Sequence, residues 1–220
     1  CYSYGFLDNF ICLCQGLLQS EADTQPSCDD SMMVAICHLF GGLFSGSPKC
    51  DPLIVKRVFP FIIWIGSNIG GETNIDIIAM LDGLTEYPLD APWNFKDMLE
   101  EPLFISFLSS VIQMKYADFE IHVINIIKNI LTVYPNGMYT LQPVIENLVD
   151  TTASLYGNIT GEVLSLMSFL LGTDWYDITI LNIYKKIIRA IPFLISSVND
   201  QIVNNVLQSI NVLRRLIGAA

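Results

Sequence analysis

The chain has 220 residues, of which 52% are hydrophobic and only 15% are charged, and its net charge is −11. An ordinary soluble domain is about 25% charged, so uncharged side chains must build most of the polar surface here. Residues 1–180 carry 6 Lys/Arg against 21 Asp/Glu, a net charge of −15, and residues 181–220 carry 5 against 1, a net charge of +4. This acidic composition excludes nucleic acid as an expected partner, because phosphate binding needs basic side chains.

All six cysteines of the chain lie in its first fifty residues: Cys1, Cys12, Cys14, Cys28, Cys37 and Cys50. An even number in one cluster predicts a local disulfide framework and an oxidising compartment. A chain that starts with cysteine is typical of a mature product after signal removal, and Asn158-Ile159-Thr160 is a glycosylation sequon. We therefore expect a secreted, extracellular protein with all six cysteines paired and with Asn158 as a glycosylation candidate.

The disulfide-rich segment, residues 1–50, is predicted to contain two helices, one over residues 6–19 and a second that includes residues 33–44. Cys12 and Cys14 are two positions apart, so on a helix they point to different faces and need different partners. We expect at least one bridge to join the two helices. The connectivity stays open, because six cysteines allow fifteen pairings.

The rest of the chain is expected to pack around residues 51–71, which read DPLIVKRVFPFIIWIGSNIGG. Asp51 is a helix N-cap and Pro52 suits the first helical position. Residues 58–65 are all apolar, which predicts a helix buried on all sides, with a kink at Pro60 where the proline removes a backbone hydrogen bond. A membrane span needs about 18 apolar residues, and the flanking polar residues make this run too short.

Helical spacing of apolar residues continues to the end of the chain, whereas strand signals are weak. The predicted helices cover residues 75–84, a short helix after Asp90, then 103–114, 119–133, 140–156, 163–171, 175–190 and 200–217. Asp118 is expected to cap the helix over residues 119–133, and Pro135-Asn136-Gly137 is expected to form the turn after it. One face of that helix is predicted to be core: Phe119, Val123, Ile126, Ile127, Ile130 and Tyr134. The sequence thus predicts an all-α fold: a single-domain helical bundle of about nine to eleven helices, with residues 1–50 packed on a cysteine-free bundle, residues 51–220. A spacing of about forty residues between helix pairs would also suit an α-solenoid, although no residue pattern repeats.

The last predicted helix has the most clearly divided faces. Its apolar-face candidates are Val203, Val206, Leu207, Ile210, Leu213 and Ile217. Asn-rich positions form the opposite face. The basic residues near this end of the chain allow two interpretations: contact with anionic head groups, or pairing with helix C-termini and with the acidic body.

Residue types that carry catalysis are sparse. The chain has two histidines, His38 and His122, and the spacing of the first of these with the cysteines does not match a zinc finger or knuckle. No nucleophile elbow, P-loop, dinucleotide-binding glycine pattern or HExxH motif is present. We therefore predict no catalytic residue, no metal site and no cofactor, and a protein that is not an enzyme.

One short stretch carries a family resemblance. Met33-Val34-Ala35-Ile36-Cys37 follows a Cys-Leu-Cys helix and a loop, and this arrangement resembles the small helical proteins of frog foam nests, the ranaspumin type. The resemblance covers about fifty of the 220 residues. It implies a secreted, disulfide-stapled, all-helical protein that acts as a surfactant or foam stabiliser.

High hydrophobic content, low charge and no transmembrane span leave two function classes. The apolar surplus can serve contact with apolar material, either an apolar ligand or an air–water or lipid interface, through amphipathic helices. It can also be an ordinary large core in a structural or interaction protein of a secretion or matrix. The sequence does not separate these classes, and it leaves the oligomeric state open.

Overall fold

The computed structural model describes about half of the chain: residues 5, 8–14, 16, 35–36, 38–39, 52–68, 73–86, 94–114, 116–154, 163, 166 and 169–170. These residues are 91% helical and include no strand, which confirms the predicted all-α class. The predicted total of nine to eleven helices stays a prediction, because helices expected at 175–190 and 200–217 lie outside the described residues. The chain divides into two compact units, residues 1–107 and residues 108–220. The predicted segment boundary at residue 50 also stays a prediction.

Helix α3, Pro52–Asn68, occupies the stretch predicted as the central helix and continues through Pro60. Val58, Phe59, Phe61, Ile62, Ile63 and Ile65 are all at most 2% exposed. The predicted burial is therefore confirmed for six of the eight residues of the apolar run, but burial on all sides is wrong, because Pro60 and Trp64 are half-buried. Trp64 is only half-buried, with its ring stacked on that of Phe61 at 6.3 Å between centroids.

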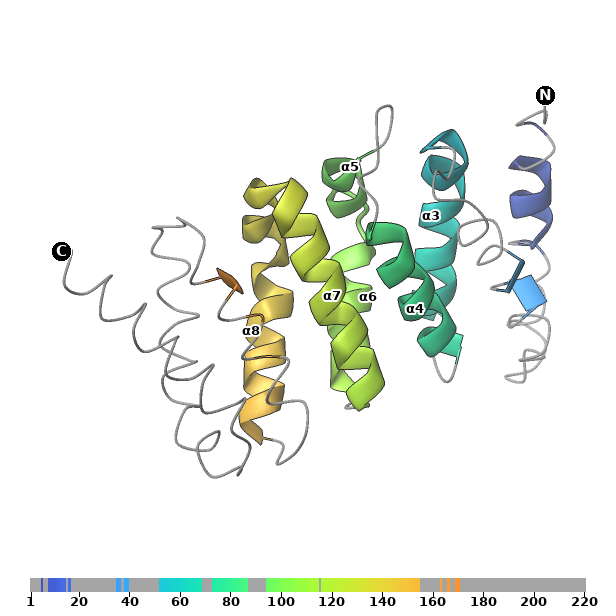
Figure 1. Cartoon of the computed structure of the whole chain (residues 1–220). Helices are drawn as coiled ribbons and strands as arrows, with labels where there is room; N and C mark the ends of the chain where they lie inside the picture. The colour runs from blue at the N-terminus through green and yellow to red at the C-terminus, as the bar shows by residue number, and fades with distance from the viewer. Residues whose placement is uncertain are drawn as a thin grey trace, which may run out of the picture. The chain divides into compact units, whose positions relative to one another are not determined.

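Helix α4, Thr73–Thr85, packs beside α3 in the first unit (Figure 1). Its buried surface is mixed. Ile77, Ile78 and Leu81 are buried, and so are the polar residues Asn74 and Asp82. The first unit therefore encloses polar side chains on α4, although the buried part of α3 is apolar.

The first unit continues with α5, Phe95–Leu99, and with the start of α6, Phe104–Gln113. The short helix was expected after Asp90, but α5 begins later because Asn94 caps it. Asn94 Oδ1 accepts a hydrogen bond from the Lys96 amide at 2.9 Å, and Asp97 Oδ2 accepts one from the Asn94 amide at 2.8 Å. This reciprocal capping box fixes where the helix starts.

The second unit contains a helical hairpin made of α7, Ala117–Val133, the 3-10 helix η1, Pro135–Gly137, and α8, Met138–Ser154 (Figure 1). Helix α8 also bonds to α6, since Asn147 Nδ2 donates to the Ser109 carbonyl oxygen at 3.2 Å. The predicted core face of α7 is confirmed for five of its six residues: Phe119, Val123, Ile126, Ile127 and Ile130 are buried. The sixth, Tyr134, is half-buried.

The expected N-cap of α7 is wrong. Asp118 was predicted to cap the helix, but it lies exposed within the first turn. The cap is Tyr116, whose extended backbone precedes the helix without a side-chain capping bond. The carboxylate of Asp118 still suits the positive end of the helix dipole.

Candidate functional site

The cysteine framework is only partly within the described residues. Cys12 is exposed and Cys14 is buried, and both are free thiols, so neither forms the disulfide expected from the sequence. Burial raises the pKa of the Cys14 thiol, against the lowering effect of a backbone hydrogen bond. Cys1, Cys28, Cys37 and Cys50 lie outside the described residues. Their pairing stays a prediction.

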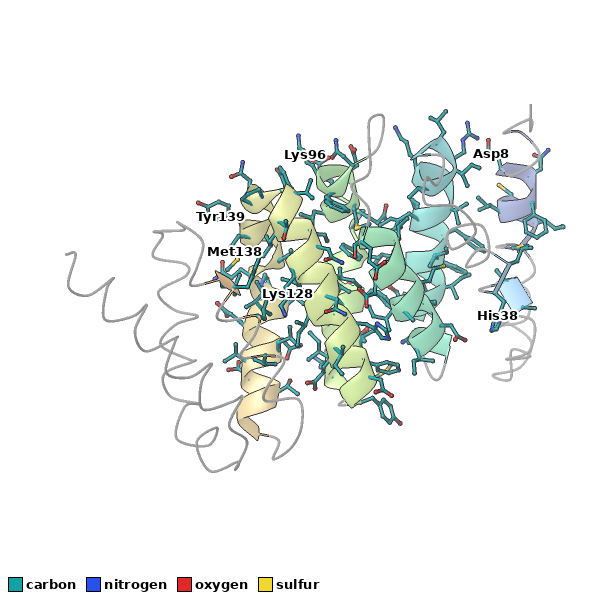
Figure 2. The ribbon with its side chains drawn as sticks, viewed as in Figure 1. Asp8, His38, Lys96, Lys128, Met138 and Tyr139 are labelled. Carbon is teal, nitrogen blue, oxygen red and sulfur yellow. The ribbon has the colours of Figure 1, made fainter. Side chains whose placement is uncertain are left out.

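Charged contacts join the N-terminal segment to the helices of the first unit. Arg57 Nη1, on α3, donates to Asp8 Oδ2. His38 Nε2 lies 3.8 Å from Asp76 Oδ2, on α4, and both side chains are largely exposed. Figure 2 labels Asp8 and His38 at these positions. Exposed pairs of this kind contribute about 0–1 kcal/mol each, so they orient the segment more than they stabilise it.

The two histidines of the chain, His38 and His122, are both among the described residues. His38 is exposed and His122 is half-buried. Among the residues that the structure describes, no group of three or more His, Cys, Asp or Glu side chains is placed to hold a metal ion. Within the same residues, no helix combines the length and the apolar character that a membrane crossing requires.

The two site candidates nearest the end of the chain cannot be placed. Asn158 lies outside the described residues, as does the whole apolar face predicted for residues 200–217. Glycosylation and the role of that face therefore stay predictions. The described helices offer a different candidate, at the turn of the second unit's hairpin.

We call residues 129–145 the hairpin end. They comprise the last turn of α7, all of η1 and the start of α8, and they contain no Asp, Glu, Lys or Arg. Two large apolar side chains are exposed there on either side of the turn: Val133 is 53% exposed and Tyr139 is 60% exposed. Figure 2 labels Tyr139 beside Met138, which is buried. The hairpin end thus presents two exposed apolar side chains in a stretch of sequence that contains no charged residue.

The backbone of the hairpin end is held by local hydrogen bonds. The Tyr134 amide donates to the Ile130 carbonyl oxygen at 2.7 Å, and the Gly137 amide donates to the Tyr134 carbonyl oxygen at 3.0 Å. Pro135 sits at the first position of η1, where its missing N–H leaves no bond unmade. Gly137 is buried under the turn. Val133 and Tyr139 are therefore presented on an ordered backbone.

Polar side chains around the hairpin end are mostly uncharged. Thr132 and Thr140 are exposed, and Thr132 Oγ1 donates to the Lys128 carbonyl oxygen at 2.7 Å. The first charged residues on either side are Lys128 and Glu146, and Glu146 Oε1 accepts a bond from Gln142 Nε2 at 2.9 Å. Contact between an apolar phase and residues 129–145 would therefore not remove water from a charged side chain of this stretch, a step that is energetically costly.

Other exposed apolar side chains of the described residues are less favourably placed. Tyr116 and Ile121 lie at the opposite end of α7, where Asp118 is also exposed. In the first unit, Leu13, Leu39, Leu53 and Ile75 belong to four separate helical stretches. Isolated exposed apolar residues are normal on soluble proteins. The hairpin end differs because its two exposed residues flank a single turn.

Sequence reasoning identified the turn at residues 135–137 but not the hairpin end as a site. The absence of charge from 129 to 145 is visible in the sequence. Uncharged runs are frequent in a chain with so few charges, so that signal does not single out this one. The exposure of Val133, which follows a buried run on α7, needs the three-dimensional structure.

Comparison of the chain with protein-family models, with curated proteins and with solved structures found no match in any of the three. Function must therefore be inferred from the residues and geometry of this chain.

Proposed function

We propose that this chain is a secreted, non-enzymatic protein that engages apolar material, and that the hairpin end makes the first contact. The observation that supports this most directly is the exposure of Val133 and Tyr139 at a turn whose residues 129–145 carry no charge. The resemblance of residues 33–37 to the foam-nest surfactants favours the same function.

An extended interface suits this geometry better than an enclosed ligand does, because both exposed side chains face solvent. Tyrosine has an apolar ring and a polar hydroxyl, so it partitions favourably where an apolar phase meets water. Complete burial of a valine-sized side chain is worth about 1.5–3 kcal/mol, and these residues are already partly buried. The hairpin end alone therefore supports shallow, reversible adsorption.

Stronger adsorption requires the helices to open. The apolar faces of α6 and α7 are buried in the folded chain, so they reach an interface only when the helices separate. Each Å² of apolar surface transferred out of water then contributes roughly 25 cal/mol. The net charge of −11 would hold neighbouring adsorbed molecules apart.

A second function class has its own support. The buried residues of α3 and the core faces of α6 and α7 absorb much of the apolar content of the described helices. That burial favours a structural or interaction protein whose many apolar residues form an ordinary core. The two classes differ in surface activity, which makes them separable by one set of measurements.

The test combines tensiometry with a fluorescent fatty-acid probe on the same sample. We expect the wild-type chain to lower surface tension more than a globular control of similar size, and the double variant Val133→Ser/Tyr139→Ser to lose most of the early adsorption rate. The matched control is Leu53→Ser/Ile75→Ser, which removes two apolar side chains that are 38% and 39% exposed in the first unit. Neither double variant changes the net charge.

The outcomes discriminate between the function classes. An equal loss of early adsorption rate in both double variants would show that the hairpin end is not the contact site. Saturable probe binding without surface activity would indicate a carrier with an internal cavity. The absence of both surface activity and probe binding would contradict contact with apolar material and would favour the structural class.

A further inference from the structure

The second unit buries an acidic side chain without a hydrogen-bond partner. Glu120 lies in the first turn of α7 and is 0% exposed. Among the residues that the structure describes, neither of its carboxyl oxygens has a hydrogen-bond partner. Its backbone amide is satisfied, since it donates to the Tyr116 carbonyl oxygen at 3.3 Å. The backbone of Glu120 is therefore satisfied, and its carboxyl group is not.

Position along the helix explains why Glu120 is buried. Ile124, Ile127 and Leu131 are four, seven and eleven residues after it, so they share its side of α7, and all three are buried. The face that packs α7 into the second unit therefore carries the carboxyl group inward. A polar group on this face cannot turn to solvent while α7 stays packed.

Burial of an ionised carboxylate without a partner is strongly unfavourable, whereas the neutral acid is tolerated much better. The positive end of the α7 dipole favours the charged form in the first turn, but desolvation dominates. Burial raises the pKa of Glu120 to about 7. The folded chain thus exchanges this proton in the physiological range.

The charged and titratable groups near the hairpin come from α7 and α8. The described part of the second unit holds five others besides the tyrosines: Asp118, His122 and Lys128 on α7, and Glu146 and Asp150 on α8. Residues 108–113 of α6 and the residues of η1 add none. Asp118 and Asp150 are exposed, and the other three are half-buried. None of them forms a hydrogen bond with the carboxyl oxygens of Glu120.

We propose that Glu120 is a proton switch in the second unit: the protonated carboxyl group keeps α7 packed, and its ionisation loosens the first turns of this helix. This inference does not depend on the proposed function, because it concerns only the packing of α7. A carboxyl group whose pKa is higher in the folded than in the unfolded chain binds the proton more tightly when folded. Its contribution to stability is therefore complete below about pH 4.5 and is lost as the pH rises toward 7.

The experiment compares the wild-type chain with Glu120→Gln, which keeps the shape of the side chain but cannot ionise. Chemical denaturation of both proteins is measured from pH 4.5 to pH 8. Between pH 4.5 and pH 7.5 the unfolding equilibrium constant of the wild type should rise about 100-fold more than that of the variant, the factor expected over this range for a pKa moved from 4.5 to about 7. Hydrogen exchange of the α7 amides should be faster in the wild type than in Glu120→Gln at pH 8. At pH 5 the two proteins should exchange at the same rate.

The matched control is Asp118→Asn, which removes an exposed carboxylate two residues before Glu120. It should keep the wild-type pH profile. Parallel profiles for the wild type and Glu120→Gln would overturn the inference. If Glu120→Gln does not fold, NMR titration of the Glu120 carboxyl carbon in the wild type decides the question, and a pKa near 4.5 would overturn the switch.

Discussion

Helices α3 and α7 have the same length, 17 residues, and both bury most of their apolar side chains. They differ in what else they bury. The charged residues of α3, Lys56 and Arg57, stay exposed or half-buried, and Arg57 pairs with Asp8. Helix α7 instead buries Glu120, whose carboxyl oxygens have no hydrogen-bond partner in the described part of the chain. Two helices with similar burial can therefore differ in their response to pH: α3 buries no charged residue, whereas the packing of α7 would depend on one proton if Glu120 is the switch proposed above.

The largest effect is expected from a charge placed in α3. Ile63→Asp should prevent folding, because Ile63 is 0% exposed and an unpaired buried charge costs several kcal/mol, comparable with a total stability of about 5–15 kcal/mol. Circular dichroism and soluble yield measure this. The control Ile75→Asp changes a residue that is 39% exposed on α4 and should fold. A folded Ile63→Asp would contradict the assignment of α3 as core.

An apolar side chain in place of Glu120 should remove the difference between α7 and α3. Glu120→Leu is expected to stabilise the chain at pH 8 by about 3 kcal/mol, the value of a pKa moved from 4.5 to about 7, and to have little effect at pH 4.5. Denaturant unfolding at the two pH values measures the change. A stabilisation that is the same at both pH values would assign the effect to packing and not to ionisation.

The smallest of these effects tests how closely α3 is packed. A Cβ atom added to Gly66 would lie 2.4 Å from Phe107 Cε2, whereas one added to Gly83 on α4 meets nothing within 4 Å. Gly66→Ala should therefore destabilise the chain by about 1–3 kcal/mol. Gly83→Ala should stabilise it by about 0.5–1 kcal/mol through helix propensity. Equal shifts in melting temperature for the two variants would show that Phe107 moves aside freely.

The sequence was sufficient for the parts of the fold that depend on periodicity. The apolar run of residues 58–65 predicted a buried α3, and helical spacing predicted the core face of α7, because burial follows the positions of the apolar side chains. The sequence was a less reliable guide to helix starts, because local hydrogen bonds and backbone conformation determine them. The start of α5 depends on the capping box of Asn94 and Asp97, and that of α7 depends on the extended backbone of Tyr116.

The candidate sites illustrate a second limit. Glu120 lies at helical spacing with Ile124, Ile127 and Leu131, so its burial could have been read from the sequence. The lack of any hydrogen-bond partner for its carboxyl oxygens could not, because partners come from other elements of the fold. The exposure of Val133 at the hairpin end also depends on how other elements of the fold pack around it.

The four-residue connection between α7 and α8, residues 134–137, also has a kinetic consequence. The residues that meet across this connection are close in the sequence, and contacts of this kind form rapidly because little chain must be ordered to close them. Helical segments form in about a microsecond, while ribosomes add only about 5–20 residues per second. The hairpin of residues 117–154 can therefore pair as soon as α8 has left the ribosome, because pairing is much faster than the addition of one further residue.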